Sequence, residues 1–161
     1  MTFSEQWLLA KTFLQTPLQI GSITPSSTHL AKVMTAAAPW PQISSVAELR
    51  AHLEHHFPQL PVYEDALELQ QTIRREGLPH VDCVISGLPF FNFTESLRSS
   101  LLDGIHKSLA PGGYFIAFQY SLQMKKILES KFELISIRLA PFNVPPAFVY
   151  VCRKKESVHL Q

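Results

Sequence analysis

The stretch "VDCVISGLPFFNF", residues 81–93, contains the segment that decides the fold. Residues 81–85 form a short, nearly continuous apolar run, which is typical of a strand buried on both faces of a parallel sheet. Residues 86–93 are too apolar for an idle linker. Because ligands bind outside the carboxyl ends of strands in open α/β sheets, we expect this loop to line a binding site.

Strands and helices alternate around this segment. We expect further strands at 46–49, 60–63, 114–120, 132–139 and 147–153, and helices at 3–15, 25–34, 51–57, 67–75, 94–109 and 122–130. This alternation predicts an α/β domain with a mostly parallel sheet and helices on both faces. The last two strands are joined by a short proline-rich loop, which predicts an antiparallel C-terminal hairpin. Residues 1–161 are therefore expected to form a single domain.

Composition narrows the function classes. The chain has 161 residues, 46% of them hydrophobic, and a formal net charge of +1. Because the net charge is small, we expect no long-range electrostatic attraction of the whole protein to nucleic acid or to anionic membranes. No stretch reaches the roughly 20 apolar residues of a membrane span, and the N-terminus lacks a signal-peptide pattern. Cys83 and Cys152 lie in apolar runs typical of buried free thiols. We expect a cytoplasmic protein.

Residues 1–40 are expected to form helices outside the sheet. The pattern of residues 3–15 is amphipathic, with Trp7 and Phe13 on the apolar side and Lys11 as its single cation. Such a helix either packs as a lid over the sheet or lies in a membrane interface. The second alternative implies peripheral contact with the inner face of the membrane.

A histidine cluster is the one metal-like pattern. His52 and His56 are an i, i+4 pair, with His55 between them. No cysteine or third ligand lies nearby, so we interpret the cluster as a solvated helix face and predict no metal site.

Three expected loops at the carboxyl ends of strands have the composition of a site. Residues 64–66 carry two carboxylates, residues 86–93 are aromatic, and residues 119–121 are polar. Together they predict an aromatic pocket with a few hydrogen-bonding groups, which is typical of a small-molecule site.

Five motifs occur in an order that resembles a known class of enzymes. They are Pro25-Ser26-Ser27, Val46-Ala47-Glu48-Leu49, Glu64-Asp65-Ala66, Asp82-Cys83-Val84-Ile85-Ser86-Gly87-Leu88-Pro89-Phe90 and Leu109-Ala110-Pro111-Gly112-Gly113. The chain thereby resembles class I S-adenosylmethionine-dependent methyltransferases, which have a Rossmann-like fold. Within that class it is most similar to bacterial phospholipid N-methyltransferases, relatives of the rRNA adenine dimethylases. The end of the chain, 143–150, also resembles that family's closing hairpin.

The resemblance implies a cofactor site for S-adenosylmethionine. The residues it assigns to the cofactor are Ile23, Ser26, Glu48, Asp65, Ala66 and Ser86. Asp65, with Ala66, corresponds to an acidic turn that binds the adenine amino group; capping of the following helix explains Asp65 equally well. Ser26 corresponds to a segment near the methionine end of the cofactor, and helix capping also explains that serine.

The resemblance also implies a substrate side, with Ser86 and Tyr120 as catalytic residues and Gly87, Leu88, Pro89, Phe90 and Tyr120 as substrate contacts. In the corresponding loop, a side-chain oxygen and backbone carbonyls accept hydrogen bonds from the target nitrogen and aim its lone pair at the methyl group. Phe90 would form an apolar wall near a cation. The alternatives are that residues 90–93 are core or dimer surface, and that Tyr120 lies at the edge of the core with a hydrated hydroxyl.

The function implied is methyl transfer to the ethanolamine head of a phospholipid. RNA adenine or a small amine is an alternative acceptor, although Ser86 in place of asparagine and the net charge of +1 argue against RNA. A module that keeps the fold without binding a cofactor is a third alternative.

The junction between Leu49 and Arg50 favours that third alternative. At this point the family carries Gly-x-Gly-x-Gly, a helix and a strand ending in an acid, whereas no glycine occurs here between Gly21 and Gly77. Parallel neighbouring strands need a crossover of about a dozen residues, and residues 51–57 supply little more than half. We therefore expect a segment of roughly 30 residues to be missing between positions 49 and 50, with a genuine deletion as the alternative.

Overall fold

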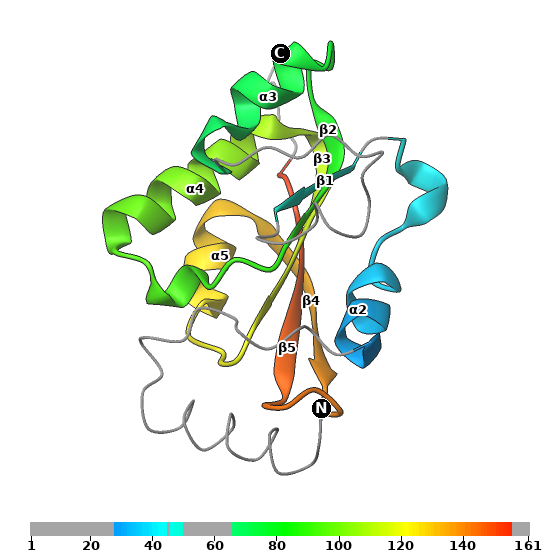
Figure 1. Cartoon of the computed structure of the whole chain (residues 1–161), viewed down its shortest axis with the longest axis vertical. Coiled ribbons are helices and arrows are strands. Elements are labelled where there is room, and N and C mark those ends of the chain that lie inside the picture. Colours follow the sequence, from blue (N-terminus) through cyan, green and yellow to red (C-terminus); the bar gives the residue numbers. More distant parts are fainter. Residues whose placement is uncertain (1–27, 45, 50–65, 156–161) are drawn as a thin grey trace.

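Strands in the described part of the chain form one five-stranded sheet in the order β1-β2-β3-β5-β4 (Figure 1). The computed structural model describes residues 28–44, 46–49 and 66–155. The strands are β1 (Val46–Leu49), β2 (Val81–Ser86), β3 (Leu109–Gln119), β4 (Glu133–Ala140) and β5 (Ala147–Arg153). The helices are α2 (Thr28–Thr35), α3 (Leu69–Arg75), α4 (Glu95–Ser108) and α5 (Lys125–Lys131), with 3₁₀ turns η1 (Trp40–Gln42), η2 (Ala66–Glu68) and η3 (Phe90–Asn92).

The pairing directions confirm the predicted fold class. β1, β2 and β3 pair in parallel, whereas β5 runs antiparallel to both β3 and β4. Leu49 and Ala117 both lie beside Ser86 in the register, so three parallel strands end at the same edge of the sheet. This carboxyl edge is where the sequence places the candidate loops.

Helices cover both faces, which explains the continuous apolar run in β2. On one face α3, α4 and α5 pack over a core that includes Val84 and Phe115. On the other face α2 packs over a second core that includes Cys83 and Ile116. Successive residues of β2 thus point into different cores, and Cys83 and Val84 are both fully buried. The two cysteines of the chain are free thiols and both are buried, as predicted.

The Pro-Gly-Gly motif lies inside β3 rather than after a helix, which corrects the strand start expected at residue 114. β3 begins at Leu109, and its register with β2 shifts between the two pairs Val81–Leu109 and Cys83–Tyr114. The extra residues form a bulge that needs glycine. Gly112 has a φ of 72°, and a Cβ on Gly113 would lie 2.9 Å from a backbone carbonyl oxygen.

The start of α4 agrees with the expected helix. Thr94 caps it, because its Oγ1 accepts a hydrogen bond from the Leu97 N–H at 3.4 Å. The helices expected at 3–15 and 51–57 and the strand expected at 60–63 lie outside the described residues. No helix in the described ranges is long and apolar enough to cross a membrane.

Candidate functional site

The carboxyl ends of β2 and β3 bring two of the expected loops together. β2 ends at Ser86, which is fully buried, and β3 ends at Gln119, which is 6% exposed. Both residues are polar, and both side chains are hydrogen-bonded, as buried polar groups generally are. The contacts of these two side chains decide the shape of the loop that follows β2.

Ser86 closes a tight turn. Its Oγ accepts a hydrogen bond from the Leu88 N–H at 3.2 Å. The hydroxyl therefore faces the backbone of its own loop, and Gly87, Leu88 and Pro89 form the half-buried segment above it. A role of the Ser86 side chain in catalysis or cofactor binding stays a prediction; in the structure it orients the loop.

Gln119 ties the same loop to β3. Its Nε2 donates to the Leu88 carbonyl oxygen at 2.9 Å and to the Phe118 carbonyl oxygen at 2.6 Å. The sequence places Gln119 in a candidate loop, but no local pattern predicts a role for its side chain. A buried amide at the end of a strand is the signal that could have identified it, because such a group needs partners.

The Phe90 ring lies in the core, which is the alternative that the sequence left open. The ring is 1% exposed and makes edge-on contacts with Phe93 and Phe115, with centroids 6.2 Å and 5.9 Å apart. Its neighbour Phe91 is 42% exposed. Phe91 is therefore the exposed ring of this loop, Phe93 is half-buried, and Phe90 anchors the loop from below.

Tyr120 follows β3 directly and is half-buried, with its ring edge-on to Phe118 at 5.6 Å. Burial raises the pKa of its hydroxyl, and a hydrogen bond from the Asn143 side chain partly offsets that rise. The phenol is therefore neutral at physiological pH. It can donate or accept a hydrogen bond, but it is not an ionised base.

Asn143 connects the β4–β5 loop to this tyrosine. It is 4% exposed, and its Nδ2 also donates to the Pro145 carbonyl oxygen at 2.8 Å. In the sequence, Asn143 is only the first residue of the segment 143–150 that resembles the family's closing hairpin. Its partner Tyr120 is distant in sequence, so no local pattern predicts their contact.

The described loops at this edge carry no charge. Residues 86–93, 119–121 and 140–147 contain hydroxyls, amides, aromatic rings and backbone carbonyls, and no Asp, Glu, Lys or Arg. Neutral acceptors suit an amine or a weakly hydrated cation, and these loops carry no cationic side chain that would pair with a phosphate. In composition they fit the sulfonium end of S-adenosylmethionine together with an amine acceptor.

Of the other residues that the resemblance assigns to the cofactor, the structure describes only Ala66 and the backbone of Glu48. Ala66 lies in η2 and packs half-buried against the core under α3. Glu48 lies in β1, with its backbone beside that of Ile85. The remaining assigned residues, Ile23, Ser26 and Asp65, are outside the described residues, so their roles stay predictions.

No group of three or more metal-ligating side chains occurs among the residues that the structure describes. The cluster of His52, His55 and His56 lies outside them.

Comparison with known proteins finds N-methyltransferases among the similar proteins. No family model matches the chain. A curated ornithine lipid N-methyltransferase of Singulisphaera acidiphila is 26% identical over 174 residues, covering 86% of this chain and 91% of the relative. The N-methyltransferase NodS of Bradyrhizobium japonicum, solved with S-adenosyl-L-homocysteine, has a TM-score of 0.58 at 10% identity, with 91% and 99% of the two chains covered. The fibrillarin pre-rRNA processing protein of Methanococcus jannaschii has a TM-score of 0.52 at 16% identity, and the match covers 70% of this chain and 56% of that one.

These matches confirm the resemblance and the fold. At 10% and 16% identity the solved structures establish the architecture alone. That architecture is the Rossmann-like sheet of class I methyltransferases, as the order of the motifs predicted.

Proposed function

We propose that this chain, which has the class I methyltransferase fold, is an S-adenosylmethionine-dependent N-methyltransferase that acts on the amino group of a lipid. The enzyme class and the cofactor are supported by the likeness to the curated N-methyltransferase and to a structure solved with S-adenosyl-L-homocysteine. Ethanolamine and ornithine both carry a primary amine on a short chain, so one site chemistry serves both head groups. We place the enzyme in the cytoplasm, at the inner face of the membrane.

The observation that carries this proposal is the uncharged, acceptor-bearing edge formed by the Ser86–Pro89 loop and Tyr120. An ammonium group has no lone pair, so the amine must be neutral when it attacks. The described loops bring no carboxylate to the amine and so do not stabilise its protonated form, whereas backbone carbonyls and the Tyr120 hydroxyl can hold a neutral amine by its N–H groups. The cofactor, when bound, supplies an electrophilic methyl group.

Each side chain then has a defined task. Gln119 fixes the loop after β2 through the Leu88 carbonyl. Asn143 fixes the Tyr120 hydroxyl. The amine is thereby oriented by groups that are already in place, which lowers the entropic cost of alignment. The proton of the amine leaves through water, because the raised pKa of Tyr120 keeps its hydroxyl protonated.

The test is a methylation assay with matched tyrosine variants. Vesicles of phosphatidylethanolamine or of ornithine lipid, and free ethanolamine as the small-amine arm, are incubated with the cofactor, and products are measured by mass spectrometry. We expect methylated lipid and a turnover about tenfold lower in Tyr120→Phe, since one hydrogen bond to the reacting group contributes about 1.4 kcal/mol. Tyr114→Phe is the control, because Tyr114 lies in the middle of β3, away from the carboxyl end that Tyr120 follows. A protein that binds S-adenosyl-L-homocysteine yet methylates no lipid would contradict the lipid substrate.

A second candidate, a fold-retaining module without cofactor binding, is favoured by the glycine-free junction after β1. The alignment with the curated relative runs over 174 residues, whereas 86% of 161 residues is about 138, so about 36 aligned positions have no counterpart here. Calorimetry with S-adenosyl-L-homocysteine separates the two candidates. An intact mass near 18.2 kDa would identify a genuine deletion rather than a missing segment.

A further inference from the structure

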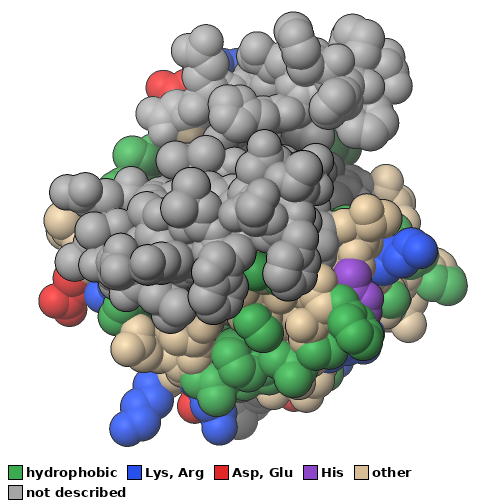
Figure 2. Space-filling view, turned by 60° about the horizontal axis from the view of Figure 1, so that its bottom comes forward, with side chains coloured by type: hydrophobic (Ala, Val, Ile, Leu, Met, Phe, Trp, Pro, Cys, Tyr) green, Lys and Arg blue, Asp and Glu red, His purple; other side chains and the backbone are tan. Residues whose placement is uncertain are grey.

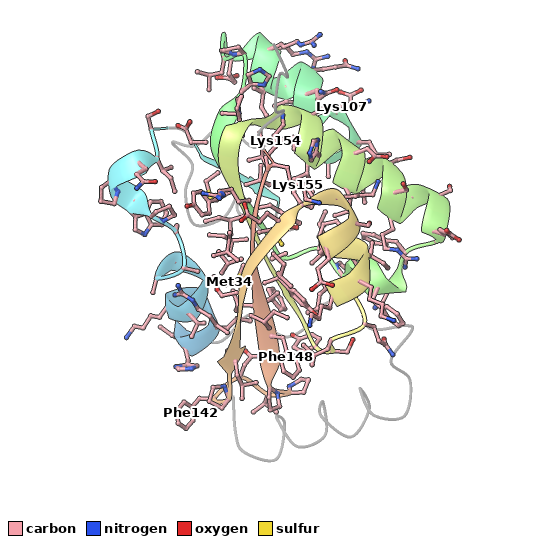
Figure 3. All side chains as sticks on the ribbon, turned by 180° about the vertical axis from the view of Figure 1, so that it is seen from behind. Met34, Lys107, Phe142, Phe148, Lys154 and Lys155 are labelled. Atoms are coloured by element: carbon pink, nitrogen blue, oxygen red, sulfur yellow. The ribbon has the colours of Figure 1, made fainter. Side chains whose placement is uncertain are left out.

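Exposed apolar side chains gather at the tip of the β4–β5 hairpin. Phe142 is 77% exposed, and Leu139 and Val144 are 53% and 51% exposed. We call these three residues the hairpin tip. Figure 2 shows hydrophobic side chains grouped on this end of the molecule, and Figure 3 shows Phe142 pointing outward beyond the strands. Large apolar groups on a monomer surface indicate an interaction site when they are contiguous.

The hairpin tip is held in place by its neighbours. The Phe142 ring is edge-on to the His29 ring of α2, with centroids 5.0 Å apart and an interplanar angle of 85°. Asn143, between Phe142 and Val144, is buried and hydrogen-bonded to the Pro145 carbonyl. The apolar side chains are therefore presented outward on a fixed loop rather than on a loose one.

The hairpin tip lies at the same edge of the sheet as the candidate site. Phe148, at the start of β5, pairs with Gln119 at the end of β3, so the loop between β4 and β5 projects from the carboxyl edge. Asn143 contacts Tyr120 directly. The exposed Phe91 and Leu122 follow β2 and β3 at this edge as well. Exposed apolar side chains therefore lie in several loops at the edge that carries the candidate site.

Positive charge flanks the hairpin tip on two sides. Lys32 is exposed on α2, and the Arg138 guanidinium, one residue before Leu139, donates to the Ala36 carbonyl oxygen at 2.9 Å. Lys125 and Lys126 begin α5. Figure 2 shows Lys and Arg side chains on both sides of the hydrophobic group.

Negative charge is scarce beside these cations. Residues 28–44 and 114–128 contain no Asp or Glu. The first carboxylate after them, Glu129, lies 3.8 Å from the Lys125 Nζ. Apolar side chains between cations match the two layers of an anionic lipid surface, in which acyl chains lie beneath negative head groups.

We propose that the hairpin tip is a docking surface for an anionic lipid bilayer, which places the loops after β2 and β3 against the head groups. The apolar side chains enter the interface, and the flanking lysines and Arg138 contact the head groups. The inference rests on the proposed function for its choice of a lipid partner. Vesicle binding itself needs neither cofactor nor turnover.

The experiment is sedimentation of the full chain with vesicles at two salt concentrations. One set contains phosphatidylethanolamine and phosphatidylglycerol, and the other contains phosphatidylcholine alone. We expect the wild type to bind the anionic vesicles at least tenfold more tightly, and binding to weaken when the salt rises from 0.1 M, because the Debye length shortens from about 10 Å to 3 Å at 1 M.

Matched variants locate the surface. The double variant Phe142→Ser, Val144→Ser should bind anionic vesicles at least tenfold more weakly, whereas Leu78→Ser should bind as the wild type does. Leu78 is 39% exposed and lies just before β2, at the opposite edge of the sheet. A complementary variant, Phe142→Trp, should give a blue-shifted fluorescence increase with anionic vesicles, and Leu78→Trp should give none.

The outcomes separate this inference from the proposed function. Equal binding by the wild type and the double variant, or no binding by the wild type, overturns the docking surface. Sedimentation velocity that shows a wild-type dimer lost in the double variant also overturns it, in favour of a second copy of the chain as the partner. Vesicle binding that depends on the hairpin tip in a protein that methylates no lipid overturns the proposed function alone.

Discussion

Replacement of Gln119 by leucine tests whether one buried amide holds the candidate site together. The Gln119 side chain is 6% exposed, and its Nε2 makes two hydrogen bonds, to Leu88 across the sheet edge and to Phe118 beside it. Leucine has nearly the same volume but cannot donate. The substitution therefore removes both bonds without leaving a large cavity.

The magnitude follows from those two contacts. A neutral hydrogen bond contributes about 1 kcal/mol net, so the loss of two costs about 2 kcal/mol. The added apolar burial of leucine offsets part of this cost, and we expect a decrease of about 1–2 kcal/mol in the free energy of unfolding. The bond to Leu88 joins residues 31 positions apart, so its loss also frees the loop that follows β2.

Two measurements check this prediction. Urea unfolding gives the change in stability, with Gln71→Leu on the exposed side of α3 as the control. Amide hydrogen exchange should show faster exchange in residues 87–93 of Gln119→Leu and unchanged exchange in α4. Equal unfolding free energies for the two variants, within about 0.5 kcal/mol, together with unchanged exchange in the loop, would refute the reasoning.

Three further outcomes are expected. Phe90→Ala should lower the free energy of unfolding by about 3–5 kcal/mol because the ring is fully buried, and Phe91→Ala by less than about 1 kcal/mol; similar losses in urea unfolding would contradict the core assignment. The hydrogen bond from Lys131 lowers the pKa of Asp103 below its ordinary value of 3.8. The Asp103–Lys131 pair therefore stabilises the folded protein above pH 3.8, and this stabilisation is lost as the pH falls through the lowered pKa. Asp103→Asn should thus cost about 0.2–1 kcal/mol at neutral pH, a difference that disappears in acid unfolding experiments. Burial raises the pKa of the two cysteine thiols to about 12, so mass spectrometry should find no iodoacetamide adduct on the native protein at pH 8 and two adducts in urea; rapid native labelling would count against their burial.

Local patterns in the sequence predicted each of the five strands that the structure describes. The β-branched run at 81–85 predicted a strand buried on both faces, and β2 lies between two cores. The proline-rich loop at 140–146 predicted the antiparallel pairing of β4 and β5. Both inferences depend on interactions within a few residues, which a local pattern records.

The same reasoning misplaced the start of β3. Pro-Gly-Gly after a helix is typical of a turn, but here the strand begins before it and bulges through it. The space that Gly113 needs is set partly by the carbonyl of Asp82, 3.1 Å from where a Cβ would lie. That carbonyl belongs to the neighbouring strand, so the reason for the glycine is not local.

The sequence predicted where in the fold the candidate site lies, but only some of the residues that organise it. The loops at the carboxyl edge follow from the topology. Gln119 and Asn143 organise those loops through partners that are distant in sequence, Leu88 and Tyr120. Phe90 and Phe91 are the same residue type at adjacent positions, so the sequence does not distinguish them. Only the fold shows that the Phe90 ring lies in the core and the Phe91 ring is exposed.

The strand order has a consequence for synthesis on the ribosome. β5 follows β4 in the chain but lies between β3 and β4 in the sheet. Until β5 has emerged, β3 has no partner on that side and β4 has no place in the sheet, so both present open edges to other chains. A nascent chain that stalls in the β4–β5 loop would therefore expose apolar strands to aggregation. When β5 emerges, it pairs with β3 and β4 and covers both open edges in one step.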